Sequence, residues 1–525
     1  MPSIRLYDRT VRRFTRRELL NVAWVLGAGA VTQSAFCRVW AQRLFTAYPF
    51  TLGVASGDPT PEGIVLWTRL APDALNGGGM PTANVSTDWE ISETDGFTRI
   101  VQKGSAVARP ELGHSVHVEV SGLQPGREYF YRFRAGGEVS QTGRTRTAPA
   151  LNAAVERMRF AVCGCSHYEQ GFFTAYRRIA EEAFDFVFHT GDYIYEGPTS
   201  GAPARVRQHL GPELFTLVDY RNRYAQYKSD PDVIAAHLSA PFIVTWDDHE
   251  VANNYAGEID ARNTPPEVFL LRRAAAYQAY YEHMPLRRAQ WPTGAGMRLY
   301  RRLRFGNLID FSVLDTRQYR SDQTCGDGPR TNCAAALDER RTLLGAEQEA
   351  WLFENLATAS GRWTVLGQQV MVSRYDRIRE NPDGQFSMDR WDGYPAARRR
   401  LVQRIAATRA SNPIILSGDI HLHFASELGA DPDRPDSPSI GVEFTNTSIS
   451  TGGDGTDVAP AWSRNRGDNP HVKFHSARRG YIAVTCTNAE IRADFKVFDR
   501  VSQPNLPVRT AESLVVEAGS RRITS

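Results

Sequence analysis

The sequence predicts an α/β layered fold preceded by a small β-sandwich, and three observations indicate it. From about residue 158 onward, short apolar runs typical of strands alternate with stretches typical of helices, which favours sheets covered by helices. Between about residues 48 and 148, short strand-like runs are separated by Gly, Pro, Asp and Asn, as in small sandwiches. Polar clusters directly follow four of the later strands, where open α/β sheets usually place ligands.

The N-terminal segment is expected to hold five strands. They are residues 52–56, 64–68, 87–91, 117–120 and 129–135. The turn Leu123-Gln124-Pro125-Gly126, followed by Tyr129, resembles the Leu-Pro-Gly…Tyr turn of fibronectin type III domains. The stretch 146–155 is rich in Ala, Thr and Pro, and it is read as a linker.

The longer C-terminal part alternates strands with helices. The expected strands are residues 160–163, 184–189, 242–246, 307–314, 363–367 and 414–416, with two more between 480 and 498. The expected helices are residues 172–183, 267–282, 347–356 and 396–407, with further helical turns between 214 and 238.

Composition and charge are those of an ordinary soluble globular protein. Hydrophobic residues make up 42% of the 525 residues and charged residues 23%, which is enough to bury a large core. The first 41 residues hold seven arginines and two acidic residues, an excess larger than the net charge of +3 of the whole chain. The rest is therefore slightly acidic, and nothing points to a nucleic-acid partner.

Residues 1–41 are read as a signal peptide. A basic stretch with the pair Arg16-Arg17 precedes a moderately apolar run, residues 22–31, and the pair resembles a twin-arginine signal. The apolar run is about half the roughly 20 residues that a spanning helix needs, so no stable membrane span is expected. We expect export by the twin-arginine machinery to the periplasm or the medium, with a membrane anchor as the alternative.

The cysteines agree with export. Cys325 and Cys333 bracket a short polar loop, and this spacing allows a disulfide in an oxidising compartment. Cys163 and Cys165 alternate along a predicted strand, where strain disfavours a bond between them. Cys486, in an apolar run, is expected to be a buried core residue.

Four polar clusters carry the chemistry, each after a strand. They are Cys163-Gly164-Cys165-Ser166-His167, His189-Thr190-Gly191-Asp192-Tyr193-Ile194-Tyr195-Glu196, Thr245-Trp246-Asp247-Asp248-His249-Glu250 and Ser417-Gly418-Asp419-Ile420-His421-Leu422-His423. Each alone could be a turn, a packing aromatic or a core thiol. Gathered at one sheet edge, they offer more anionic groups than a site without cations tolerates, so they predict a metal cluster. Carboxylates suit hard cations, and thiolate and phenolate with carboxylate suit ferric iron.

The clusters also support a family resemblance. The Gly191-Asp192-Tyr193-Ile194-Tyr195 segment resembles the Gly-Asp-x-x-Tyr box of metallophosphoesterases related to purple acid phosphatases. Asp248 and Asp419 stand where those enzymes have Asn and His, and in this the sequence is similar to PhoD-type alkaline phosphatases. Further segments agree with that family, namely 53–59, 168–176, 314–319, 391–395 and 447–450. The resemblance covers about residues 49–497 and implies a four-layer sandwich of two mixed sheets flanked by helices, behind a fibronectin III-like β-sandwich.

The resemblance implies a mixed centre of ferric iron (Fe³⁺) and calcium (Ca²⁺). The implied metal ligands are Cys165, Asp192, Tyr195, Asp248, Asp419 and His421. Cys163 is the alternative thiolate, because it lies two residues before Cys165. His249 aligns with the histidine that contacts phosphate. Arg317 is a candidate catalytic fork for phosphate, and a structural ion pair with Asp315 or another carboxylate is the alternative.

Three other polar or aromatic positions are interpreted from their place near the clusters. Gln368 is interpreted as a polar group behind the metal ligands. His423 is expected to line the cleft or pack. Trp391 and Tyr394 could belong to a lid over the cleft or to ordinary packing.

The predicted function is hydrolysis of phosphate esters by a secreted, metal-dependent alkaline phosphatase that releases phosphate from monoesters. A phosphodiesterase of phospholipase D, teichoic-acid or nucleotide type is the alternative, and a non-catalytic binding protein is a minor one. The predicted organisation is a signal peptide (1–41), a β-sandwich domain (46–148), a catalytic domain (158–498) and a C-terminal tail (499–525). We expect a monomer.

Overall fold

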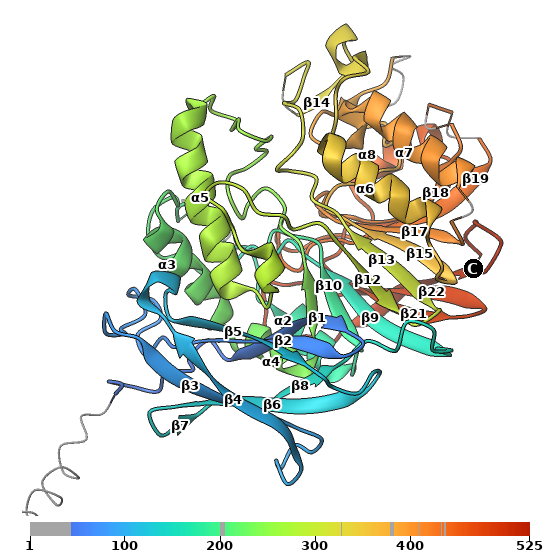
Figure 1. The fold of residues 1–525 in the computed structure, drawn as a ribbon. Helices are drawn as coiled ribbons and strands as arrows, with labels where there is room; N and C mark the ends of the chain where they lie inside the picture. Colours follow the sequence, from blue (N-terminus) through green and yellow to red (C-terminus); the bar gives the residue numbers. More distant parts are fainter. Residues whose placement is uncertain are drawn as a thin grey trace, which may run out of the picture. The chain divides into compact units, whose positions relative to one another are not determined.

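The structure, a computed structural model, describes residues 44–199, 205–326, 328–378, 383–408, 410–431, 433–434 and 437–524. The predicted signal peptide, residues 1–41, lies outside the described residues. Residues 47–525 form one unit in which two sheets lie face to face between two groups of helices (Figure 1). The α/β layered architecture predicted from the sequence is thereby confirmed.

The first sheet has nine strands in the described part of the chain. Their spatial order is β23 (Arg509–Glu517), β22 (Glu490–Val497), β21 (Gly480–Thr487), β9 (Arg157–Cys163), β10 (Phe186–His189), β11 (Phe242–Val244), β1 (Val54–Thr60), β2 (Gly63–Arg69) and β5 (Ser115–Ser121). The centre of the sheet, β9, β10, β11 and β1, is parallel, whereas the pairs outside it on both flanks are antiparallel. Strand β10 is buried along its whole length, as expected of a central parallel strand.

The second sheet has seven strands among the described residues. Their order is β12 (Arg301–Phe305), β13 (Ile309–Val313), β15 (Trp363–Gly367), β17 (Pro413–Ser417), β19 (Ser439–Thr445), β18 (His423–Gly429) and β20 (Val472–Ser476). Strands β13, β15, β17 and β19 are parallel. One core lies between the two sheets and includes Phe188 of the first and Phe311 and Leu416 of the second.

Helices cover the outer face of each sheet. They are α2 (Thr174–Glu181), α3 (Leu217–Lys228), α4 (Pro231–Ser239) and α5 (Pro266–His283) on the first sheet, α6 (Gly345–Ala357) and α7 (Pro395–Ala407) on the second, and the short α8 (Pro460–Asn465). Five short 3-10 turns complete the described elements, namely η1 (Pro110–Leu112), η2 (Arg288–Gln290), η3 (Ala334–Leu337), η4 (Trp391–Gly393) and η5 (Arg466–Asp468).

Local sequence signals set several helix starts. Helix α3 begins with a capping box, in which the Thr216 hydroxyl accepts from the Asp219 N–H and the Asp219 carboxylate accepts from the Thr216 N–H. Helix α4 begins at Pro231, and the Asp230 carboxylate accepts the N–H of Asp232 at 2.8 Å. These caps fix the helices that pack beside the polar clusters.

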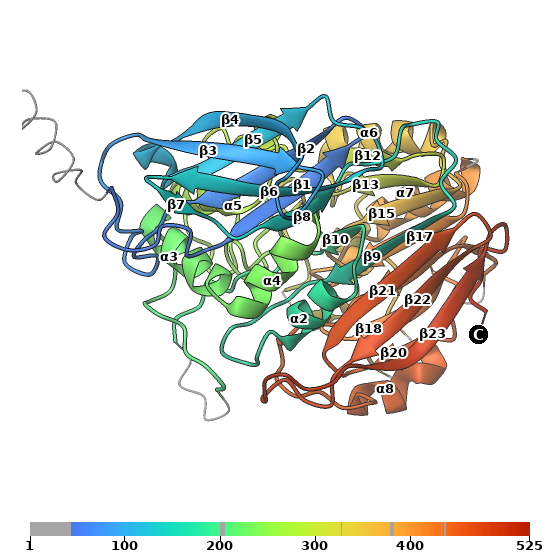
Figure 2. The same cartoon turned by 90° about the horizontal axis from the view of Figure 1, so that it is seen from below.

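The N-terminal β-sandwich is present, but one of its layers is shared. Its outer layer holds β4 (Ile100–Ala108), β3 (Val85–Ser92), β6 (Glu128–Ala135) and β7 (Glu138–Val139), with β8 (Gly143–Arg146) paired to β6. Its inner layer, β1, β2 and β5, continues the nine-stranded sheet, because β1 pairs with β11 at Gly57 and Phe242 (Figure 2). A Cβ on Gly57 would lie 2.6 Å from the Phe242 carbonyl oxygen, so glycine permits this close pairing.

Ten strands of the described part of the chain lie outside the predicted ranges, among them β12, β18, β19 and β20 of the second sheet. Two of the others, β4 and β23, show why. Strand β4 is an exposed edge strand with weak alternation. Strand β23 lies in the segment that the sequence assigns to a tail, and it pairs with β22. Only Leu514 and Val516 of β23 are buried, so its apolar pattern is too short to predict a strand.

The predicted disulfide is confirmed between Cys325 and Cys333. Next to it lies a two-stranded sheet of β14 (Pro329–Arg330) and β16 (Phe386–Ser387). Cys486 is buried in the core, as predicted. None of the helices in the described ranges is long and apolar enough to cross a membrane.

Candidate metal centre

The four polar clusters meet at one edge of the two central sheets. Cys165 follows β9, Asp192 follows β10, Asp248 follows β11 and Asp419 follows β17. Because neighbouring central strands run parallel, their carboxyl ends lie at the same edge. These residues consequently fall into three overlapping donor groups, with ligand atoms within 4.8 Å of one another in each group, although the segments are far apart in sequence.

The backbone at these positions is unusual. Cys165, Asp192, Asp419 and His421 have φ angles of 57°, 55°, 64° and 59°, in the left-handed region that non-glycine residues avoid. Each such residue costs about 1–3 kcal/mol, and such strain gathers at functional sites. The preceding glycines allow close packing, since a Cβ on Gly164 or Gly418 would lie 2.2 or 2.6 Å from the Thr190 hydroxyl oxygen.

One half of the centre combines a thiol, a phenol, an imidazole and a carboxylate. Ligand atoms of Cys165, Asp192 and His421 lie within 4.8 Å of one another. The Tyr195 hydroxyl donates to Asp192 Oδ2 at 2.8 Å and lies 3.4 Å from His421 Nε2. Thr451 Oγ1 donates to the Tyr195 hydroxyl oxygen at 2.7 Å. Four of the sequence-predicted ligands thus converge on one point.

The other half is carboxylate-rich. Oxygens of Asp247, Asp248 and Asp419 lie within 4.8 Å of one another. Asp192 and Asp248 form a further group with His249, so Asp192 lies between the two halves. Asp247 Oδ2 and Asp248 Oδ1 are buried without a hydrogen-bond donor among the described residues. Buried carboxylate oxygens without donors are costly, and a cation is what such oxygens accept.

The donor set fits bound cations. Burial, with added repulsion from Asp192, raises the pKa of the Cys165 thiol and of the Tyr195 phenol well above their ordinary values. Burial also raises the pKa of Asp247 well above its usual range, and the nearby Arg317 only partly offsets this. These groups favour their neutral forms without a cation, whereas a bound ion would stabilise the anions.

His249 is held by a buried carboxylate. Its Nδ1 atom lies 2.6 Å from Glu196 Oε2, and its backbone N–H donates to Asp192 Oδ1 at 3.3 Å. Burial lowers the pKa of His249, but Glu196, Asp248 and Asp192 outweigh it and raise this pKa well above the ordinary value. The side chain is 19% exposed, so the imidazole also reaches solvent.

Arg317 forms ion pairs and has no exposed surface. Its Nε donates to Asp247, and its Nη1 contacts both Asp389 oxygens at 3.0 and 2.8 Å. Its Nη2 lies 3.3 Å from Asp419 Oδ1 and 3.5 Å from Asp248 Oδ1. The guanidinium therefore makes the structural ion pairs that the sequence left open, with Asp247 and Asp389 rather than with Asp315.

Cys163 and Cys165 face different surroundings. Cys163 packs in the apolar core beneath the helices, whereas Cys165 contributes to the donor group with Asp192. The structure thus brings Cys165, and not Cys163, to the other predicted ligands.

The remaining candidates are buried away from the donors. The Gln368 side chain bonds to Val370 O and to Trp391 Nε1, at 2.5 and 3.1 Å. His423 is fully buried and packs edge-on against Phe495. Trp391 and Tyr394 belong to the buried core around α6 and α7, so they pack as ordinary core residues.

Sequence reasoning missed several members of the centre. Glu250 accepts the backbone N–H groups of Asp192, Tyr193 and Asp247 at 3.1, 2.6 and 2.8 Å, and so ties two ligand loops together. Glu196 and Asp247 lie within the polar clusters next to predicted ligands, so their position in the sequence could have identified them as members of the centre. Asp389 and Arg390 come from a distant loop, and no local signal identifies them.

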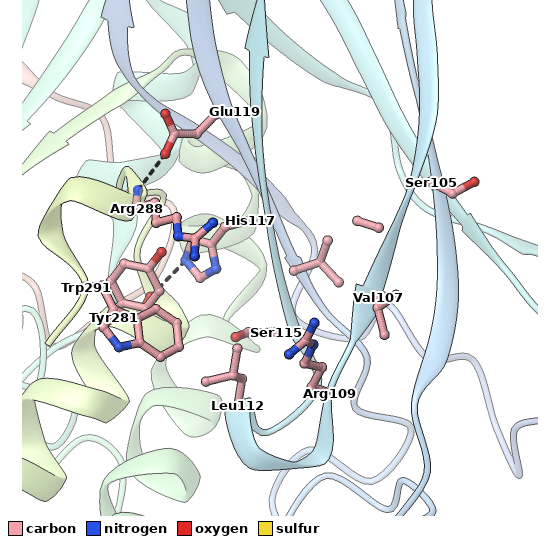
Figure 3. A pocket seen from close by; sticks show the side chains of 12 residues that line it. Ser105, Val107, Arg109, Leu112, Ser115, His117, Glu119, Tyr281, Arg288 and Trp291 are labelled. Atoms are coloured by element: carbon pink, nitrogen blue, oxygen red, sulfur yellow. Dashed lines mark hydrogen bonds between the residues drawn. The ribbon is translucent and has the colours of Figure 1, made fainter. Parts of the chain in front are cut away.

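A separate groove lies away from these donors. It has a volume of about 900 Å³ and lies between β4, β5 and the C-terminal end of α5 (Figure 3). Trp291 and Tyr281 line one wall and Val107 the other, with Arg109 and Arg288 nearby. Glu119, the one acidic residue among the described residues that line it, accepts the backbone N–H of Arg288 at 2.6 Å. This groove lacks the clustered donors, so we place the functional site at the metal centre.

A four-layer α/β sandwich that gathers carboxylates, imidazoles, a thiol and a phenol at one sheet edge defines a metal-dependent hydrolase. Comparison with family models gives the particular family. Residues 160–495 match the PhoD-like phosphatase family and residues 35–149 match its N-terminal domain. The chain belongs to the PhoD-like phosphatase family, whose members are phosphoric ester hydrolases.

Two relatives agree with this assignment. Alkaline phosphatase D of Bacillus subtilis (strain 168) is 47% identical over 487 residues, which cover 92% of this chain and 83% of the relative. A solved structure described as that of PhoD superposes with a TM-score of 0.89 at 47% identity, over 91% of this chain and 92% of the other. The fold and the enzyme class predicted from the sequence are thereby confirmed.

Proposed function

We propose that this centre hydrolyses phosphate monoesters and releases inorganic phosphate. The observation that carries the proposal is the sharing of Asp192 between two buried donor groups, next to an imidazole held by Glu196. A phosphate ester is anionic, so its hydrolysis needs positive charge at the phosphoryl oxygens and a proton donor at the leaving oxygen. The buried donor groups could hold cations that supply the positive charge, and His249 could serve as the proton donor.

In this proposal the ions are ferric iron and calcium. Cys165, Asp192 and Tyr195 would hold iron, because thiolate, phenolate and carboxylate together suit Fe³⁺. Asp248 and Asp419 would hold calcium with Asp192 between the metals, and His421 would complete the set. Asp247 joins the proposed ligand set because its Oδ2 atom is buried without a donor among the described residues.

When bound, the ions supply charge neutralisation at the phosphoryl group and lower the pKa of nearby water. The chain's own groups would orient the reaction. Glu196 would hold the His249 ring through Nδ1, which leaves Nε2 free to donate a hydrogen bond or proton to the ester oxygen. The proposed role of Arg317 is to hold Asp247, Asp389 and Asp419, rather than to bind phosphate.

Metal analysis of the purified protein, combined with a visible absorption spectrum, tests the metal assignment. We expect iron and calcium, with a visible band that disappears in Tyr195→Phe. A colourless protein that contains only zinc would contradict it. A matched control is Tyr300→Phe, because the Tyr300 hydroxyl bonds to Glu347 at 2.8 Å outside the proposed ligand set.

Kinetics with a monoester and a diester that share one leaving group test the substrate class. We expect a higher kcat/KM for the monoester. A higher value for the diester would instead establish the phosphodiesterase alternative, with phospholipid headgroups, teichoic acids or nucleotides as substrate classes to examine.

We also propose that the protein is exported through the twin-arginine machinery as a monomer. The support is the Arg16-Arg17 pair ahead of a short apolar run. If the export route is correct, the Arg16→Lys/Arg17→Lys variant should remain in the cytoplasm. Light scattering of the purified protein would measure its molar mass and so test whether it is a monomer. The proposed domains are residues 46–148 and 158–498, and separate expression of the two segments would test this division.

A further inference from the structure

The guanidinium of Arg390, at the centre, has N–H donors without an acceptor in the described part of the chain. Arg390 directly precedes η4, and its Nε donates to Asp419 Oδ2 at 2.6 Å. Its side chain is 14% exposed. The two terminal nitrogens, Nη1 and Nη2, have no acceptor among the described residues. Arg390 is therefore anchored to a proposed metal ligand by one nitrogen and open at the other two.

The neighbouring arginines contrast with it. The side chains of Arg317 and Arg320 have no exposed surface. The nitrogens of Arg317 are engaged by four carboxylates, and the Arg320 guanidinium contacts Asp389. Both guanidiniums are fully buried and paired with carboxylates, so neither is open to a substrate that enters from solvent.

A second cation, Arg377, lies near Arg390. Partial burial lowers the pKa of Arg377, and the Arg390 charge lowers it further, although much of the Arg377 side chain is exposed. The Arg377 side chain has no carboxylate partner within the described ranges, and Asp419 acts on it only through its charge. Asp389 and Asp392 also act on Arg390, so the two free terminal nitrogens, and not an overall excess of positive charge, are what an anionic ligand would find there.

We propose that Arg390 binds a terminal oxygen of the phosphoryl group and gives the centre its preference for monoesters. Two free N–H groups at the end of a planar guanidinium suit the oxygens of a phosphoryl group. A monoester has three terminal oxygens and up to two charges, whereas a diester has two such oxygens and one charge. Ions bound at the centre would themselves occupy terminal oxygens of the ester. A monoester, with three such oxygens, would then still offer one to Arg390. The inference rests on the proposed function, and Arg390 moves no proton and forms no bond.

The test compares Arg390→Ala and Arg390→Lys with the parent enzyme on 4-nitrophenyl phosphate and bis(4-nitrophenyl) phosphate, which share a leaving group. For Arg390→Ala we expect kcat/KM on the monoester to fall about 10–100-fold, as for loss of a charge-assisted hydrogen bond. The diester value should fall by less than about threefold, because less negative charge is left unpaired. The inhibition constant of inorganic phosphate should rise along with the monoester loss, and metal content should not change. The monoester kcat/KM of Arg390→Lys should lie between those of the parent and Arg390→Ala, since lysine keeps the charge but lacks the planar guanidinium with its paired N–H donors.

The control is Arg399→Ala on α7, whose guanidinium pairs with Glu339 at 2.6 Å on the surface. It removes the same charge and should leave both substrates unchanged. Equal losses on the two esters, or loss of metal in Arg390→Ala and Arg390→Lys alike, would overturn the proposal and show that Arg390 only supports Asp419. If the parent enzyme turns over neither ester, the proposed function fails. Calorimetry would then test Arg390 independently of activity, by comparing the affinity of inorganic phosphate for the parent and for Arg390→Ala. Weaker binding to the variant would support the proposed role of Arg390, and equal affinity would overturn it.

Discussion

The Nδ1 atom of His249 lies 2.6 Å from Oε2 of Glu196, and this contact orients the imidazole at the centre. The other Glu196 oxygen accepts the backbone N–H of Asn253 at 2.7 Å, so the carboxylate is itself fixed. Tyr195 packs against the imidazole, with ring centroids 4.1 Å apart. The fixed Glu196 carboxylate and the neighbouring Tyr195 ring thus leave His249 little rotational freedom.

Glu196→Ala should therefore lower kcat about 10–100-fold with little change in KM or metal content, because it frees a proton donor without removing a ligand. The loss should be larger for an alkyl phosphate than for 4-nitrophenyl phosphate, since a poor leaving group depends more on protonation. Steady-state kinetics on both esters measure this. Glu347→Gln, which alters a hydrogen bond to Tyr300, is the control, and an equal loss on both esters would contradict the positioning role.

The local part of the centre could be predicted from the sequence. Cys165, Asp192, Asp248 and Asp419 each follow a short apolar strand, and parallel strands bring their carboxyl ends together. The position of each motif directly after a strand was therefore enough to predict that these ligands converge at one sheet edge. The layered fold was predictable for the same reason, because the strands and helices alternate with clear periods.

The contacts between distant loops could not be predicted. Arg317 and Asp389 are 72 residues apart, and their pairing depends on how the loop before η4 folds over the sheet edge. The continuation of the large sheet through β1 is equally non-local, since Gly57 pairs with Phe242. From the sequence alone, the N-terminal strands and the later strands of this sheet are assigned to separate domains, because each group has its own local pattern.

Arg317 should be the costliest arginine to replace. Its side chain has no exposed surface and contacts four carboxylates, so Arg317→Met leaves buried negative charges without a partner. We expect a loss of about 3–5 kcal/mol in the free energy of unfolding. Lysine at this position should recover part of it, because it restores the charge but not the fork. Urea denaturation measures both variants.

Arg340→Met provides the comparison, since Arg340 pairs with Asp338 on the surface with its side chain 90% exposed. It should not change the urea midpoint measurably, because exposed ion pairs contribute little. Equal midpoints for the Arg317→Met variant and the parent would show that the buried network does not hold the fold together.

Removal of the disulfide should destabilise the region around η3. Cys325 and Cys333 are separated by eight positions, and closing a loop of this length restricts the unfolded chain by about 2–3 kcal/mol in the chain-entropy model. Cys325→Ser/Cys333→Ser should therefore lower the Tm, and reductant should lower the parent's Tm by a similar amount. If reductant destabilises the double variant as much as the parent, the effect does not come from this bond.

Lys228 should make stability depend on pH. Its ammonium group is buried, with Nζ 3.4 Å from His237 Nε2 and 4.3 Å from the centre of the Trp67 ring. Burial lowers the pKa of Lys228 to about 7. Between this value and the ordinary lysine pKa, the unfolded chain binds a proton that the folded chain releases. The contribution of Lys228 to the free energy of unfolding therefore rises with pH across this window and is constant below it.

Lys228→Met removes that dependence. The variant should exceed the parent in stability by a few kcal/mol at neutral pH, since one pKa unit corresponds to about 1.4 kcal/mol. The difference should shrink steadily toward pH 10, where the parent's lysine is already neutral in the folded state. Denaturation midpoints at several pH values measure it, with Lys496→Met as the control because Lys496 bonds to Thr510 at an exposed edge. A difference between Lys228→Met and the parent that stays constant from pH 7 to pH 10 would mean that Lys228 keeps its proton inside the fold.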